Sequence, residues 1–168
     1  MLDSWRANGL NLIGEFVLDL MKTELEEQGH RATGKLIDSM TYKINGDSIE
    51  FYAEDYAKFV DSGRQKGARR VPIDALIAWI EQKGIASGDT EVKKVAYLIQ
   101  KKIYEEGSPT MGSLQYSQNG RRKDFIKFAV TENEKIILQK VIEIFDKTVK
   151  TEFINEMINI RKQWQQRT

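Results

Sequence analysis

The chain has 168 residues, 40% of them hydrophobic and 30% charged, and its 26 lysines and arginines nearly balance its 25 aspartates and glutamates. This is the composition of an ordinary globular protein, and the balance excludes a global electrostatic attraction to nucleic acid or acidic membranes. The absence of cysteine excludes disulfides, thiolate nucleophiles and cysteine-ligated zinc, and the apolar runs are too short for a signal peptide or membrane span.

The first predicted element is an amphipathic helix that Asp3 or Ser4 can cap and that Gly29 terminates. Its apolar residues recur at three- and four-residue spacing: Leu10, Ile13, Phe16, Val17, Leu20 and Met21. Segment 33–39 follows, and we interpret it as a turn of helix that leads into strands.

A β-hairpin is predicted next, from segments 40–44 and 48–53, which are rich in aromatic and β-branched residues. The turn between them, Asn45-Gly46-Asp47, contains an Asn-Gly pair that readily supplies positive φ angles. Side chains alternate along a strand, so one face is suited to packing against the first helix: Tyr42, Ile44, Ile49 and Phe51.

The centre of the chain predicts a helical turn at 56–60 that ends at Ser62-Gly63, and then two helices. Between the turn and the first of these helices lies a basic loop with four cations: Arg64, Lys66, Arg69 and Arg70. Pro72 is suited to a helix start, and the following helix ends at Gly84. The second helix covers about 90–106, with Gly107 as its stop.

Segment 108–123 is rich in Ser, Gly, Gln and Asn and has a basic end, Arg121-Arg122-Lys123, which is typical of a mobile loop. Segment 124–130 is compatible with a short helix or a strand. Thr131-Glu132-Asn133-Glu134 has the spacing of a capping box, and we expect it to open a last helix that continues to Gln163.

The last helix changes character along its length. Its first half is apolar over a broad face that indicates core packing: Ile136, Ile137, Leu138, Val141, Ile142, Ile144 and Phe145. Its second half keeps a narrow stripe, which indicates a seam for another helix: Val149, Phe153, Met157, Ile160 and Trp164. We therefore predict an α+β domain over 1–130 and a C-terminal helical extension over 131–168.

Catalytic chemistry finds little support in the sequence. The one histidine, His30, follows a helix stop with no companion of a catalytic triad nearby, and 63–67 lacks the spacing of a phosphate-binding loop. The acidic residues around the hairpin match no nuclease signature: Asp38, Glu50, Glu54 and Asp55. We expect no enzyme, no metal site and no cofactor. Trp79 is expected to be a partly buried core residue.

The basic clusters at 64–70 and 121–123 leave a second hypothesis open. Each cation that contacts a phosphate adds salt-dependent affinity, so the two clusters can make the chain a nucleic-acid-binding module. No aromatic residues are interleaved with the cations of either cluster, and ordinary solvation or contact with a protein partner is the favoured interpretation.

The order of several motifs carries more information than any one of them. The hairpin is preceded by a first motif, Thr33-Gly34-Lys35-Leu36-Ile37-Asp38-Ser39. It is followed by a second motif, Tyr56-Ala57-Lys58-Phe59-Val60-Asp61-Ser62-Gly63. Pro72-Ile73-Asp74-Ala75-Leu76-Ile77-Ala78-Trp79 comes next. This order resembles the tail-completion, or head-to-tail connector, family of virion morphogenesis proteins in tailed bacteriophages, over about residues 30–130. Asp61 stands where that family more often has glutamate. With this resemblance, we expect four residues of the second motif to hold the domain together: Tyr56, Phe59, Val60 and Gly63.

The resemblance implies an α+β fold in which the first helix packs on a small antiparallel sheet. It also implies a structural virion protein, made in the host cytoplasm and placed in the neck or tail region. Copies would form a ring, often sixfold or twelvefold, next to a portal-side connector ring and tail proteins, with possible contact to DNA in the channel. The basic loop, the 121–123 cluster and the stripe of the last helix would contact neighbours.

Overall fold

The computed structural model describes residues 2–31 and 34–165. It is a mixed helix and strand structure, as predicted, with a long helix at each end, a two-stranded antiparallel sheet and several helices between them. In chain order the elements are α1 Leu2–Glu27, α2 Lys35–Ser39, β1 Thr41–Asn45, β2 Ser48–Tyr52, α3 Ala57–Ser62, α4 Ile73–Lys83, α5 Asp89–Glu106, the 3-10 helix η1 Met111–Tyr116, α6 Phe125–Val130 and α7 Glu134–Gln165.

One face of α1 forms the main core. Val17 and Met21 are buried, as the periodicity predicted, and Leu25, four residues further on, extends the same buried row. Side chains of α2 and α6 and the residue after α2 close this core: Leu36, Ile37, Met40, Phe125 and Ala129. The predicted caps are wrong, because the helix already begins at Leu2 and places Asp3 and Ser4 in its first turn.

The hairpin lies along α1, as predicted. Tyr42 pairs with Phe51 and Ile44 with Ile49, and these four side chains are the half-buried positions of the two strands. The turn consists of Gly46 and Asp47, with Asn45 still paired in β1. Gly46 has φ of 60°, and a glycine at the first central position is typical of a type II′ turn.

A second, smaller core lies between α4 and α5. Leu76 and Ile80 of α4 pack against Val92 and Ala96 of α5, and all four are buried. Trp79 is partly buried against this cluster, as predicted. We call this pair of helices with its core the α4–α5 lobe.

The lobe is joined to the rest of the molecule where two chain segments pass each other. Arg64 and Ser108 exchange both backbone hydrogen bonds, at 2.8 and 2.9 Å, as an isolated antiparallel bridge. A glycine stands directly before each of them, Gly63 with φ of 71° and Gly107 with φ of 87°. We call segments 63–64 and 107–108 the waist.

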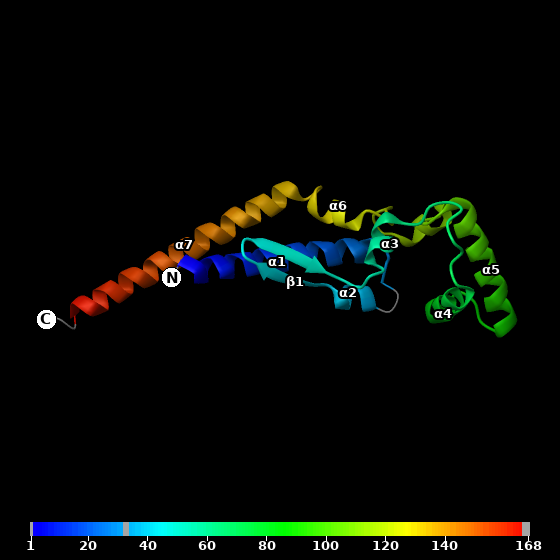
Figure 1. Ribbon diagram of the computed structural model, residues 1–168, viewed down its shortest axis with the longest axis horizontal. Coiled ribbons are helices and arrows are strands. Elements are labelled where there is room, and N and C mark those ends of the chain that lie inside the picture. The colour runs from blue at the N-terminus through cyan, green and yellow to red at the C-terminus, as the bar shows by residue number, and fades with distance from the viewer. Residues whose placement is uncertain (1, 32–33, 166–168) are drawn as a thin grey trace.

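Segment 124–130 is helical, which settles the alternative that the sequence left open. The carboxylate of Asp61 accepts a hydrogen bond from the Ile126 N–H at the start of α6, at 3.0 Å. The capping box predicted before α7 is wrong: Asn133 directly precedes the helix, and its side chain donates back to the carbonyl groups of Phe128 and Ala129. These bonds connect turn 131–133 to the end of α6, and α7 continues from there towards the C-terminal end of the molecule (Figure 1).

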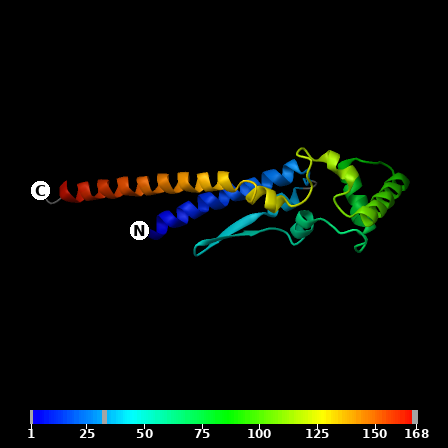
Figure 2. The same ribbon diagram turned by 90° about the horizontal axis from the view of Figure 1, so that it is seen from above.

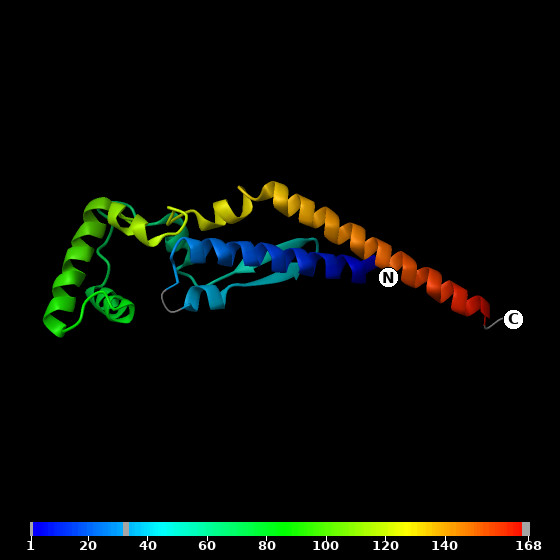
Figure 3. The same cartoon turned by 180° about the vertical axis from the view of Figure 1, so that it is seen from behind.

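The molecule is elongated (Figure 1). Seen from above, α1 lies between the hairpin and α7 (Figure 2), and it packs against both. The α4–α5 lobe occupies one end, and the last turns of α7 extend beyond the start of α1 at the other (Figure 3). The predicted domain boundary at residue 130 coincides with the end of α6. That residues 131–168 form an extension separate from the domain stays a prediction.

Candidate functional site

The motif residues of the first segment hold α2 and its surroundings. Gly34 adopts a left-handed conformation before α2, and Leu36 is buried in the main core. The Ser39 hydroxyl donates to the Leu36 carbonyl and accepts the Glu54 N–H, which connects α2 to the segment after β2. Thr33, the remaining predicted residue of this motif, lies outside the described residues.

The second motif divides between core and surface. Ala57 and Val60 pack against the main core, and Asp61 binds α6 through its carboxylate and also through its carbonyl group, which accepts the Asp124 N–H. Tyr56 and Phe59, which we expected to hold the domain together, are 39% and 54% exposed. That expectation is wrong, because the six-residue α3 and the residue before it bury neither ring.

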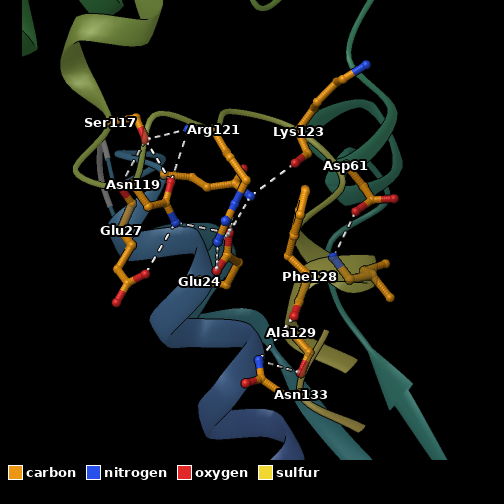
Figure 4. Close-up of polar contacts among 12 residues, drawn as sticks. Glu24, Glu27, Asp61, Ser117, Asn119, Arg121, Lys123, Phe128, Ala129 and Asn133 are labelled. Atoms are coloured by element: carbon orange, nitrogen blue, oxygen red, sulfur yellow. Dashed lines mark hydrogen bonds and ion pairs between the residues drawn. The ribbon is translucent and has the colours of Figure 1, made fainter. Parts of the chain in front are cut away.

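The basic end of segment 108–123 is bound to α1. The Arg121 guanidinium forms hydrogen bonds of 3.0 to 3.2 Å with the carboxylate of the buried Glu24 and lies 4.0 Å from the centre of the Phe128 ring (Figure 4). Asn119 donates to Glu24 and Glu27. A segment that we predicted as a mobile loop is thus connected to the end of α1 by charge-assisted bonds.

Arg122 bonds to the backbone. Its guanidinium donates to the Ser113 carbonyl, and burial lowers its pKa. Its own carbonyl group accepts a hydrogen bond from His30 Nε2 at 3.2 Å, which means that the neutral ring carries its proton on Nε2. Arg121 and Arg122 are therefore internal structural residues, in place of the partner contacts we predicted, because buried acceptors occupy them. Lys123 remains more exposed and pairs with Asp124.

Replacing Arg121 should test this internal role. Arg121→Gln would leave the buried Glu24 carboxylate with only its amide donors, Asn119 and Gln28. We expect a loss of about 2 kcal/mol in the free energy of unfolding, since removing one partner of a buried ion pair is costly and this arginine is partly exposed. Lys123→Gln, measured alongside by urea denaturation, should change stability by less than about 0.5 kcal/mol. Equal effects would contradict the assignment.

The His30 contact predicts a pH dependence of stability. Burial, with the nearby Arg122 charge, lowers the pKa of His30 from 6.5 to about 4. Between these values the unfolded chain binds a proton that the folded chain does not, so stability should fall as the pH falls from 6.5 towards 4. Urea denaturation across this window should show a smaller loss for His30→Gln than for the unaltered chain. Parallel profiles would contradict the role of His30.

The basic loop has a different environment. Arg64 donates to the Arg69 carbonyl, and the Arg70 guanidinium lies over the Tyr104 ring at 5.2 Å. Lys66 and Arg69 are exposed and make no salt bridge within the described part of the chain. The loop lies just before α4, where Pro72 precedes the first helical residue as predicted. Of the two basic clusters, this one keeps cations for an external partner.

The first half of α7 packs on α1 through a narrow face. Ile144 is buried, and Ile144 and Phe145 approach α1 at Gly9, where an added Cβ would lie 3.8 Å from the Phe145 ring. Three residues that we assigned to this core face are instead 52 to 61% exposed: Ile136, Leu138 and Ile142. The prediction of a broad buried face was therefore wrong in part, because one packed helix covers only a narrow stripe of another helix.

The predicted seam in the second half of α7 is exposed. Val149, Phe153, Met157 and Ile160 are 52, 67, 53 and 43% exposed. The side chain of Trp164, the fifth predicted member, lies outside what the structure describes. A separate apolar group on another side of the helix is also exposed: Ile136, Ile154 and Ile158. The sequence pattern did not single out this second group.

Chemical sites are sparse in the described residues. No group of three or more His, Cys, Asp or Glu side chains there is placed to hold a metal ion. A surface recess of about 350 Å³ is lined by Arg6, Leu10, Asp47 and Phe145, and its two charges pair with each other. Within residues 2–31 and 34–165, every helix is too short or too polar to cross a membrane.

Comparison with protein-family models, with curated proteins and with solved structures found no match to this chain.

Proposed function

We propose that the protein is a structural subunit of a tailed-bacteriophage virion, in a ring of the head-to-tail connector or tail-completion region, without catalytic activity. The order of the motifs supports the family, as set out from the sequence. The placement of Ala57, Val60 and Asp61 between the main core and α6 is compatible with it, because these motif residues organise the fold.

The observation that carries an assembly function is the exposed apolar surface of α7. A solvated helix normally presents polar residues outwards, and contiguous exposed apolar residues mark contacts with other molecules. Here two groups on different sides of one helix are exposed. A ring of several subunits needs more than one contact surface on each subunit, and two such groups can supply them.

The second candidate, a nucleic-acid-binding module, now depends on one basic cluster. Arg121 and Arg122 bond within the chain, and Lys66, Arg69 and Arg70 remain. That candidate predicts binding to duplex DNA whose affinity falls steeply with salt and is lost in Arg69→Ala/Arg70→Ala.

Mixing the protein with a purified phage connector complex and, separately, with duplex DNA tests both candidates. Co-sedimentation with the connector complex at physiological salt supports the proposal. Salt-sensitive DNA binding without any binding to the connector complex would replace it with the nucleic-acid function.

A further inference from the structure

We infer that the exposed stripe of α7, formed by Val149, Phe153, Met157 and Ile160, is covered by the α7 helix of a second copy of this chain, which lies parallel to it and in register. The inference rests on the proposed function in one respect, since both require the chain to associate with itself. It adds which surface makes the contact and in which direction the two helices run.

The first step is that α1 is not the partner of the stripe. The row of α7 that faces α1 contains Ile144 and Thr148, and at helical spacing it continues beyond the start of α1 as Glu152, Asn155 and Asn159. The row thus becomes polar where α1 no longer covers it. The apolar stripe lies roughly 140° further round the helix, on a side that faces away from α1.

The second step is that the stripe fits another helix. Its four residues are spaced by four, four and three positions, so they form one continuous line about 17 Å long. Each is at least 43% exposed. Apolar residues at alternating three- and four-residue spacing form the seam between paired helices, and polar residues on both sides restrict the contact to that line.

The third step is the charge on the two flanks of the stripe, which selects the direction. Glu152 and Glu156 lie on one flank, and Arg161 lies on the other, five positions after Glu156. None of the three forms a salt bridge within the described residues. Parallel helices bring opposite flanks together, which places Glu156 opposite Arg161 of the neighbouring copy, whereas antiparallel helices would bring the glutamates of the two copies together.

Cysteine cross-linking tests the arrangement directly, because the chain has no cysteine of its own. Val149→Cys and Ile160→Cys are prepared singly in the full chain and treated with an oxidant or a short bismaleimide. Parallel, in-register helices predict that each variant cross-links with itself. An assembled protein that cross-links only when the two variants are mixed would show antiparallel helices and overturn the inference. An assembled protein with no cross-link would place the contact elsewhere and also overturn it.

A charge reversal tests the direction by affinity. Glu156→Arg places like charges across the seam and should weaken self-association about fivefold, and Glu156→Arg/Arg161→Glu should restore it. Lys162→Glu, on the polar row, is the matched control and should leave the association unchanged. Failure of the double variant to recover would overturn the parallel arrangement alone. A monomer at every concentration, both alone and with a connector complex, would overturn the proposed function and the inference with it.

Discussion

Truncation after Phe145 should leave a folded monomer and abolish assembly. The shortened chain keeps Ile137, which packs on the main core, and Ile144, which approaches α1 at Gly9, together with both cores. It loses the exposed stripe from Val149 onwards. We expect circular dichroism to show a cooperative thermal transition near that of the full chain, while light scattering gives the mass of one chain at concentrations where the full chain assembles.

A point variant separates loss of the stripe from loss of the helix. Phe153→Ser/Met157→Ser keeps the full length of α7 and should also prevent assembly, because both side chains lie on the stripe. Lys147→Ser/Thr151→Ser is the control, because it changes two exposed positions of α7 outside the stripe. This variant should assemble normally. Normal assembly of the truncated chain would contradict the account, since the truncation removes the stripe together with Ile154 and Ile158 of the second exposed group.

Gly63→Ala should destabilise the protein by about 3 to 5 kcal/mol. Gly63 has φ of 71° and ψ of −167°, a conformation that is essentially restricted to glycine. A Cβ there would lie 2.2 Å from the carbonyl oxygen of Ser108, which is backbone and bonded to Arg64. The methyl group therefore cannot be accommodated unless the waist opens. Urea denaturation measures the loss.

Gly67→Ala is the control for a positive φ angle without a close neighbour. Gly67 has φ of 75°, close to that of Gly63, but an added Cβ would meet nothing within 4 Å. Its substitution should cost only about 1 to 2 kcal/mol. Gly107→Ala should resemble Gly63→Ala, because its Cβ would lie 2.5 Å from the Arg64 carbonyl oxygen. Equal losses for Gly63→Ala and Gly67→Ala would show that the waist is not tightly packed.

The waist explains one limit of prediction from the sequence. The glycines at positions 63 and 107 were recognised as stops of local helices, which they are. Gly63 also lies close to Ser108, and Gly107 lies close to Arg64. These contacts depend on pairing between segments more than forty residues apart, and no local sequence pattern encodes such pairing. Periodicity predicted α1, the hairpin, α4 and α5 because each has an apolar face of its own.

The basic cluster at 121–123 shows a second limit. Three consecutive cations have the same sequence pattern whether they are solvated, bound to a partner or bound to the chain itself. The partner of Arg121 is Glu24, 97 positions earlier, and it was one carboxylate among 25 acidic residues. The capping box failed for a related reason, since Asn133 competes for the same turn and binds α6. The family and its function stay predictions that rest on the order of motifs.

The solution mass of the purified full chain tests the central claim most directly. Light scattering is measured over a range of concentrations, first for the protein alone and then with a purified phage connector complex. The account predicts a discrete multiple of the 19.4 kDa chain, formed alone or on that complex. A monomer that persists at every concentration and ignores the connector complex would contradict it.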